Sequence, residues 1–415
     1  MRIRSAGLAL FVGLSMMLAA CSSNGPSTSP SSAATTAPTS DGSSAPSAAP
    51  SGSDAAPSGS AAHSDLLIGV VTDVGTANDK SYNEYTYVGA QQGAAAIGAD
   101  PPPVVVPESA ADYAPLIQAM VAQDFDIIVT TGVDLMPATA AAAKKNPNIW
   151  FIGVDQDPCI NATGDVDPSS KDCSGDVSKL LPRYIAVDYA EDQAGYLAGI
   201  VAASTTKSKL IGAIGGVKSC GPCVKYMQGY DLGAKSVDPA IKVKTAFVSP
   251  DDDKVGFSDQ GAGKTFATQF INQYPGLDVL FQAAGLTGAD TRTGKGILDA
   301  ACTAGIDAIG VDVDQSLSYP AAQPCILTSA EKRFSSSVSA SIVGISSGAA
   351  TGGVTRFDAA NDGIGVSPFH DAASRLPTDI QTRIDTAIAG MKAGSLTTCP
   401  PAPECGKIPA PKIGD

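Results

Sequence analysis

The sequence predicts an α/β protein whose main body is divided into two similar lobes. Short apolar runs rich in valine and isoleucine alternate with helical stretches along most of the chain. This alternation is typical of parallel sheets covered by helices. The body that follows the N-terminal region has about 350 residues, and its apolar runs are too many for one compact sheet. We therefore expect two sheets, each with its own core.

The first half of the body contains an ordered series of expected strands and helices. The run LLIGVV at 66–71 is apolar without interruption, which indicates a strand buried on both faces. Expected strands lie at 66–71, 102–107, 126–132, 149–155 and 183–189, and expected helices at 83–98, 112–123, 137–146 and 191–205. A segment flanked by cysteines, at about 156–176, interrupts the alternation.

The second half repeats the same alternation. Expected strands lie at 209–216, 241–248, 278–285, 306–314 and 325–331, and expected helices at 225–237, 262–275, 294–305 and 335–350. The stretch at 376–394 predicts one more amphipathic helix before the C-terminal tail.

The N-terminus predicts export and a lipid anchor. Positive charge in MRIR precedes the apolar stretch 6–20, which is short for a membrane span and is typical of a secretory signal peptide. It ends in LAAC, which resembles the lipobox of bacterial lipoproteins, so we expect residues 1–21 to be a signal peptide with Cys21 as the lipidated residue. The alternative is an ordinary signal peptide with a chance cysteine.

Residues 22–63 consist almost wholly of serine, alanine, proline, threonine and glycine. Such a segment cannot bury enough apolar surface to offset its chain entropy, so we expect a disordered tether. A lipid at Cys21 followed by this tether would hold the body at the extracytoplasmic face of the cell membrane.

The net charge and the cysteine content restrict the classes of function that fit the sequence. The net charge of −14 disfavours nucleic-acid binding, which needs a basic face. Eight cysteines remain besides Cys21, and an even number in an exported chain indicates disulfides. The simplest pairing joins sequence neighbours, although spacing alone leaves the connectivity open: 159–173, 220–223, 302–325 and 399–405.

The motif Cys-Gly-Pro-Cys at 220–223 has two interpretations. It is the redox motif of thioredoxin-like proteins, so an exported thiol–disulfide oxidoreductase that uses Cys220 and Cys223 is one alternative function. The other is a structural bridge, which we favour because the chain is several times longer than a thioredoxin domain. His370 is the body's single histidine, and we see no nucleophile set, so we expect a binding protein without cofactor or metal.

The loop TDVGTANDKSYNEY at 72–85 joins the first expected strand to the first expected helix. In open parallel sheets, ligands bind at this end of the strands. Tyr82 is the one aromatic among the loop's polar residues, which are Asp73, Asn78, Asp79, Lys80, Ser81 and Asn83. A loop tip needs no aromatic for its own stability. Tyr82 therefore either packs under its own helix or takes part in recognition.

Several stretches resemble the basic membrane protein family of ABC-transporter substrate-binding lipoproteins, whose characterised members bind purine nucleosides. The resemblance extends from about Leu66 to Gly394 and is carried by TDVGTANDKSYNEY, FIGVDQD, EDQAGYLAG, VKYMQGYDLGAK, AAGLTG, AIGVDVDQ and ILTSAEKR. It implies a type I periplasmic-binding-protein fold, with two Rossmann-like lobes and a ligand cleft between them. It also implies an ABC permease as partner, and we expect a monomer. A ligand sensor of the same fold remains another alternative.

The resemblance places four residues at the base of a nucleoside. Tyr82 stands where the family has a phenylalanine that stacks on the base, and Phe257 aligns with the second aromatic, on the other lobe. Asp73 would accept hydrogen bonds from base nitrogens, and Asn83 offers both a donor and an acceptor. Phe257 could equally be a core residue.

Four more residues are assigned to the cleft in the same way. Asp155 matches another cleft aspartate, Asp312 and Lys332 match contacts with ribose hydroxyls, and Gly285 lets the backbone approach the sugar. Each aspartate could instead cap a helix, and Lys332 could be an ordinary salt-bridged residue. The loop 288–296, the Cys220–Cys223 turn and the segment 156–176 depart from the family pattern and leave the ligand's identity open.

With this fold, the lobes are expected at the following boundaries. The first lobe should comprise 64–187 and 306–330, the second lobe 188–305 and 331–375, and the C-terminal helix and tail 376–415.

Overall fold

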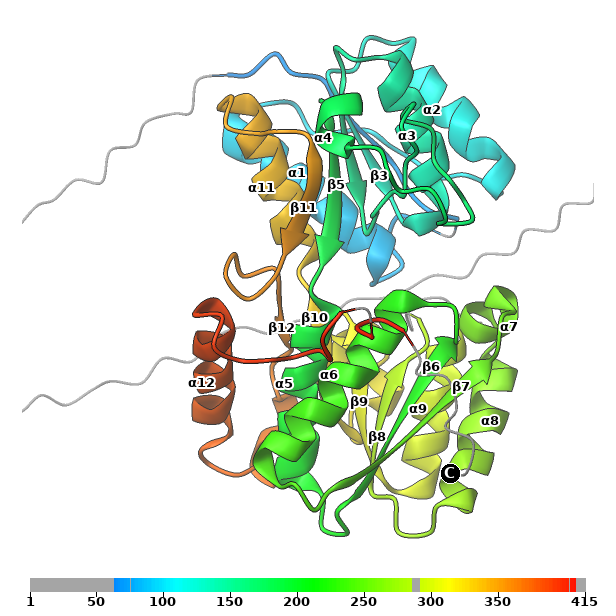
Figure 1. The fold of residues 1–415 in the computed structure, drawn as a ribbon, viewed down its shortest axis with the longest axis vertical. Helices are drawn as coiled ribbons and strands as arrows, with labels where there is room; N and C mark the ends of the chain where they lie inside the picture. The colour runs from blue at the N-terminus through cyan, green and yellow to red at the C-terminus, as the bar shows by residue number, and fades with distance from the viewer. Residues whose placement is uncertain (1–62, 75, 286–291, 403, 408–415) are drawn as a thin grey trace, which may run out of the picture. The chain divides into compact units, whose positions relative to one another are not determined.

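Two six-stranded sheets organise the chain and confirm the predicted α/β class with two lobes (Figure 1). The structure is a computed structural model that describes residues 63–74, 76–285, 292–402 and 404–407. The strand orders are β11–β5–β4–β3–β1–β2 in the first sheet and β12–β10–β9–β8–β6–β7 in the second. We call the parts built on these sheets the first and the second lobe. In the described part of the chain, no helix has the length and apolar character needed to cross a membrane.

The first sheet is entirely parallel in its pairings. Its inner strand β1 is buried at every residue, as the uninterrupted apolar run predicts. The strands are β1 (Ile68–Val71), β2 (Val104–Val105), β3 (Ile127–Thr131), β4 (Trp150–Val154), β5 (Tyr184–Tyr189) and β11 (Gly353–Phe357).

Helices α1 and α11 lie side by side in the first lobe, although they are far apart in the sequence (Figure 1). Their close approach requires glycine, because a Cβ at Gly89 would lie 2.6 Å from the carbonyl oxygen of Ser335. The helices are α1 (Tyr82–Ile97), α2 (Tyr113–Val121), α3 (Met136–Lys145), α4 (Val177–Leu180) and α11 (Phe334–Ser346), with 3-10 turns at Ala110–Asp112 and Val133–Leu135.

The second sheet is parallel except for its edge strand β12, which pairs with β10 in the antiparallel direction. The strands are β6 (Leu210–Val217), β7 (Lys242–Ser249), β8 (Val279–Ala283), β9 (Asp307–Asp312), β10 (Ile326–Lys332) and β12 (Ile364–Val366). The helices are α5 (Glu191–Thr205), α6 (Gly221–Val237), α7 (Asp253–Ser258), α8 (Gln260–Gln273), α9 (Thr293–Ala304), α10 (Gln315–Ser318) and α12 (Ile380–Lys392), with 3-10 turns at Pro320–Ala322 and His370–Arg375.

Helices α5 and α6 pack with their backbones almost in contact. Gly195 and Gly199 on α5 face the backbone of α6, and Gly229 and Gly233 on α6 face the backbone of α5. A Cβ at Gly229 would lie only 2.0 Å from the carbonyl oxygen of Asp192. The glycines therefore fix how α5 lies against the middle of α6, and side chains from the N-terminal parts of both helices enter the site described below.

The expected lobe boundaries are wrong in two places. The segment 306–330 was assigned to the first lobe, but it contains β9 and most of β10, which pair within the second sheet. The segment 331–375 was assigned to the second lobe, but it contains α11, which packs on α1, and β11, which pairs with β5. The chain crosses between lobes after β5, after β10 and after β11, and a regular alternation of strands and helices does not show where those crossings fall.

The expected disulfides are all present in the structure. They join Cys159 to Cys173, Cys220 to Cys223, Cys302 to Cys325, and Cys399 to Cys405. The first closes the interrupting segment between β4 and α4, where Ile160 and Val166 form an isolated antiparallel bridge. The second closes the first turn of α6 and is a bridge in this fold.

The backbone contact between α5 and α6 predicts a large cost for one added methyl group. Gly229→Ala should lower the free energy of unfolding by about 1–3 kcal/mol or more, because the new Cβ meets backbone atoms that cannot turn aside. The matched control is Gly344→Ala in α11, where a Cβ would lie 3.6 Å from its nearest neighbour, an ordinary contact. This control should be neutral or stabilising by up to about 1 kcal/mol. Urea melts of both variants test the prediction, and equal stability of the two would contradict it.

Candidate functional site

The expected site residues lie at the carboxyl ends of parallel strands, where ligands bind in such sheets. Asp73 follows β1 and Asp155 follows β4 in the first lobe. Gly285 follows β8 in the second lobe, Asp312 ends β9, and Lys332 ends β10 at a crossing between the lobes. Cys21 lies outside the described residues, as do residues 288–291 of the long loop at 288–296.

Asn83 is fully committed to the loop after β1. Its side chain is buried, its Oδ1 accepts from the backbone N–H of Asp73 at 2.9 Å, and its Nδ2 donates to the Asp73 carbonyl at 3.3 Å. Both ends of the amide are therefore used to shape the loop. Asn83 positions Asp73 rather than presenting a free amide.

Asp73 has a partner that sequence reasoning missed. The hydroxyl of Tyr113, at the start of α2, donates to Oδ1 of Asp73 at 2.5 Å. Burial and the bond to Asp73 raise the pKa of Tyr113. The sequence contains no local signal for this contact, because the position of Tyr113 on an amphipathic helix is equally typical of an ordinary core aromatic.

Tyr82 is half-buried, with its hydroxyl anchored inside the first lobe. The hydroxyl donates to the carbonyl of Val154 at 3.2 Å, and the ring meets Phe334 edge-on with centroids 4.8 Å apart. Gly132, with φ of 102°, lets this ring and Asp73 come together, since a Cβ there would lie 3.3 Å from Tyr82 and 3.4 Å from Asp73. Burial raises the pKa of Tyr82 well above its ordinary value, so the hydroxyl is a neutral donor.

Phe257 and Gly285 lie together on the second lobe. The Phe257 ring covers Gly216 of β6, where a Cβ would lie 2.3 Å from the ring, and it also approaches Gly285. Gly285 has φ of 88°, a conformation that favours glycine. Both lie beside the carboxyl end of the second sheet.

Lys332 is the point at which two other expected residues, Asp155 and Asp312, converge. Its ammonium donates to both carboxylate oxygens of Asp155, at 2.9 and 3.0 Å, and lies 3.7 Å from Oδ1 of Asp312. Its side chain is only 3% exposed. One buried cation therefore contacts a carboxylate after β4 in the first sheet and another at the end of β9 in the second.

A third carboxylate, Glu191, completes this centre, and sequence reasoning missed it. Glu191 is the first residue of α5 and is wholly buried. Its Oε1 lies 3.2 Å from the Lys332 ammonium without hydrogen-bond geometry, and its Oε2 lies 3.5 Å from Nζ of Lys225 on α6. The only signal in the sequence was an acidic residue at a helix start, which is common for reasons of helix capping and dipole alone.

Two tyrosines enclose the Lys332 centre. The ammonium lies 5.6 Å from the ring centroid of Tyr189 and 5.7 Å from that of Tyr226, within the range of cation–π attraction. The Tyr226 hydroxyl also donates to Oδ1 of Asp312 at 3.1 Å. These rings exclude water from the cation and leave the carboxylates as its main partners.

The charges of the centre are strongly coupled. Burial would lower the pKa of Lys332, but Asp155, Glu191 and Asp312 outweigh it and raise the pKa well above the ordinary value. Burial also raises the pKa of Asp312 to about 6, against the opposing effect of Lys332. Burial would raise the pKa of Glu191, but Lys332 and Lys225 reverse the shift and lower it. Lys332 therefore stays charged, and the pKa of Asp312 lies closer to neutrality than that of an ordinary aspartate.

Asp155 and Asp312 end two matching turns, one in each lobe. Each follows Gly-Val at the end of a strand, and each has a left-handed backbone, with φ of 59° and 66°. In both turns a buried glutamine covers the glycine: the side chain of Gln156 lies over Gly153, and that of Gln315 over Gly310.

The two glutamines hold these strained turns through hydrogen bonds. Gln156 donates to the Gly132 carbonyl at 2.8 Å and accepts from the Tyr184 hydroxyl at 2.5 Å. Gln315 accepts from the Val311 N–H at 3.2 Å and from Nε2 of Gln282 at 2.8 Å. The similar sequences GVDQD and GVDVDQ were the signal in the sequence for these two matching turns. The left-handed backbone that the turns share is visible only in the structure.

The arrangement favours binding of a polar ligand over metal binding. Within the described ranges, no group of three or more His, Cys, Asp or Glu side chains is placed to hold a metal ion. The three carboxylates that do converge are neutralised by Lys332. Such a set offers acceptors and one donor for ligand hydroxyls.

Comparison with known proteins assigns the family. The family described as PnrA-like ABC transporter substrate-binding proteins matches residues 67–388. The chain belongs to this family. It is 30% identical over 267 residues to the ABC transporter nucleoside-binding protein BmpA of Lactococcus lactis, covering 63% of this chain and 68% of that protein. It is 31% identical over 193 residues to basic membrane protein D of Borreliella burgdorferi, covering 46% and 52%.

Solved structures support the fold at lower sequence identity. An ABC transporter solute-binding protein from Conexibacter woesei has a TM-score of 0.60 at 20% identity, covering 80% of this chain and 98% of its own. A solute-binding protein from Aeropyrum pernix has a TM-score of 0.60 at 21% identity, covering 82% and 94%. These neighbours bear out the expected type I fold of a periplasmic solute-binding protein for this family member.

The Lys332 centre predicts a strong dependence of stability on its one cation. Lys332→Met should lower the free energy of unfolding at pH 7 by about 3–5 kcal/mol, because it leaves buried carboxylates without a partner. The loss should shrink at pH 5, where Asp155 and Asp312, deprived of the cation, take up protons in the folded state.

The matched control is Lys235→Met, which removes an exposed helix pair with Asp231. It should cost about 0–1 kcal/mol. Urea melts at both pH values measure the two effects. A Lys332→Met protein as stable as the Lys235→Met protein at pH 7 would show that the centre contributes nothing to the fold.

Proposed function

We propose that this substrate-binding protein captures a purine nucleoside and delivers it to an ABC permease. The observation that carries the proposal is the Lys332 centre, in which one buried ammonium contacts Asp155 and Asp312 at the carboxyl ends of two different sheets. Vicinal hydroxyls of a ribose suit this set, because carboxylates accept hydrogen bonds and an ammonium donates them. The nucleoside-binding name of the Lactococcus lactis relative supports the same ligand class.

The base would be bound by the aromatic and acidic residues of the strand ends. The ring of Tyr82 and the carboxylate of Asp73 lie close together beside Gly132. One face of a base could therefore stack on the Tyr82 ring while a nitrogen of the same base donates a hydrogen bond to Asp73. Phe257 would cover the base from the second lobe, and Gly285 beside it would leave room for the sugar. The Tyr82 hydroxyl, bonded to Val154, would fix the ring and leave base contacts to the ring face.

Delivery would take place at the membrane surface. Cys21 would carry the lipid, residues 22–63 would act as the tether, and the body would work as a monomer that closes around its ligand by a hinge motion. The three crossings between the lobes supply the segments that such a motion would bend.

Tyr82 gives the sharpest test of the ligand class. Calorimetric titration with adenosine, guanosine and inosine should show binding, while free ribose should bind weakly or not at all. Tyr82→Ala should weaken nucleoside binding by about 1–3 kcal/mol, the usual loss for one stacked base, or about 5- to 150-fold in dissociation constant. Tyr82→Phe should bind nearly normally, because it keeps the ring.

The matched control is Tyr87→Ala, which removes another half-buried tyrosine of α1 whose hydroxyl also donates to a backbone carbonyl, that of Pro102. Tyr87→Ala should lower the free energy of unfolding without changing the affinity for nucleosides. If sugars bind and nucleosides do not, the nucleoside proposal is wrong. If a folded Tyr82→Ala protein binds nucleosides normally, Tyr82 has no part in the site.

A further inference from the structure

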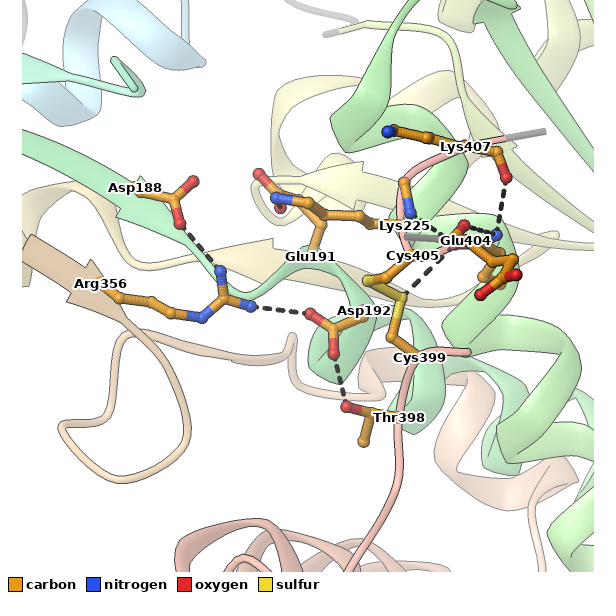
Figure 2. Close-up of a disulfide and its surroundings, with 12 residues drawn as sticks. Asp188, Glu191, Asp192, Lys225, Arg356, Thr398, Cys399, Glu404, Cys405 and Lys407 are labelled. Carbon is orange, nitrogen blue, oxygen red and sulfur yellow. Dashed lines mark hydrogen bonds and ion pairs between the residues drawn. A yellow bond between two sulfur atoms is a disulfide. The ribbon is translucent and has the colours of Figure 1, made fainter. Parts of the chain in front are cut away.

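A C-terminal loop, described at residues 398–402 and 404–407, docks on the first turn of α5 and the first two turns of α6. It follows α12, is closed by the Cys399–Cys405 disulfide, and lies outside the part of the chain that matches the family. Figure 2 shows this loop beside Glu191, Asp192 and Lys225. The loop thus reaches the helix ends that supply Glu191 to the Lys332 centre.

The first contact of the loop is with Gln228 on α6. Nε2 of Gln228 donates to the carbonyls of Glu404, at 2.9 Å, and Lys407, at 3.1 Å, while its Oε1 accepts from the Gly406 N–H at 2.8 Å. One amide therefore satisfies three backbone groups of the loop. Such a match requires a loop of defined shape, which the disulfide favours by restricting the alternatives.

The second contact is with Asp192 on α5. The Thr398 hydroxyl donates to Oδ2 of Asp192 at 2.5 Å, and both residues are buried, with 7% and 5% exposed. The other oxygen of Asp192 accepts from Arg356 of β11 at 3.0 Å, and Arg356 also donates to Asp188 of β5 at 2.9 Å. Figure 2 shows this continuous series from Asp188 to Thr398. Asp192 therefore ties the loop to two strands of the first sheet across the first crossing.

Both contacts adjoin the residues that hold Glu191. Asp192 is its neighbour in the first turn of α5, and Lys225 precedes Gln228 by one turn on α6. Among the described side chains, the partners of the Glu191 carboxylate are Lys332, at 3.2 Å, and Lys225 of α6, at 3.5 Å. The position of its carboxylate is therefore set mainly by where the two helix ends lie.

We propose that the C-terminal loop is a clasp that fixes these two helix ends and so holds Glu191 against Lys332, with Thr398 and Gln228 as positioning residues. If the contact of the loop with either helix were broken, the Glu191 carboxylate would move away from Lys332. The Lys332 ammonium would then pair more closely with Asp312. Its consequence for ligand affinity rests on the proposed nucleoside function, whereas its consequence for the ligand-free centre does not.

The test compares Thr398→Val, which removes the hydroxyl, with Thr398→Ser, which keeps it. Nuclear magnetic resonance titration of the Asp312 carboxyl in the ligand-free protein is the first measurement. In Thr398→Val the pKa of Asp312 should fall from its value of about 6, because the repulsion from Glu191 weakens while Lys332 and Tyr226 remain and Asp155 is unchanged. Thr398→Ser should restore the wild-type value. Thr397→Val, at the exposed neighbouring position, should also leave it unchanged.

Affinity for the nucleoside that binds the wild type is the second measurement. Thr398→Val should raise the dissociation constant about 3- to 10-fold, and Gln228→Met should do the same. If one of the two variants fails to fold, the other still tests the proposal. If the variants melt at lower temperature but keep the Asp312 pKa and the affinity, the loop is only a structural brace and the clasp is refuted. If the wild type binds no nucleoside, the proposed function fails, and the Asp312 titration alone still decides for or against the clasp.

Discussion

The buried ammonium of Lys332 is the interaction on which the arrangement of the site depends. A cation taken out of water is costly unless charged partners surround it, and three carboxylates do so here. Each partner comes from a different element: Asp155 after β4, Glu191 at the start of α5 and Asp312 at the end of β9. One ion cluster therefore requires the first sheet, the second sheet and a crossing segment to meet at a single point. Under the proposed function, a ligand that enters this point would replace some of these contacts with contacts to its own hydroxyls, which would link binding to the position of the lobes.

Backbone conformations that are costly elsewhere make the cluster possible. Asp155 and Asp312 both adopt the left-handed region, which non-glycine residues rarely occupy, and each is held there by a buried glutamine. The packing of α5 and α6 contributes in another way, because their glycines let Glu191 and Lys225 approach each other from the N-terminal parts of the two helices. The site thus depends on two strained turns and on closely packed helices, and the surrounding sheets stabilise both.

Much of this organisation could be predicted from the sequence, and the reasons for the gaps are physical. The α/β class follows from alternating apolar runs, and the family resemblance singles out residues such as Asp73 and Asp312, which follow or end buried strands. The lobe boundaries could not be read from the sequence, because β9 continues the same alternation of strands and helices as its neighbours, and no local signal shows which sheet it joins. Strand β11, which returns the chain to the first sheet, lies outside the strands that the sequence predicts. Glu191 was missed because an acid at a helix start has a local explanation, and its role appears only when the chain crosses back beside Lys332.

Proton release on ligand binding tests the Lys332 account most directly. A ligand hydroxyl that donates to Asp312 favours the ionised carboxylate, and burial sets the pKa of this group at about 6 in the free protein. Calorimetry of the bound nucleoside from pH 7.5 to 5, in buffers of different ionisation enthalpy, measures both affinity and proton exchange. The account predicts constant affinity above about pH 6, a loss approaching tenfold per pH unit below it, and proton release that disappears in Asp312→Asn. Affinity that is flat across this range, with no protons released by the wild type, would contradict it.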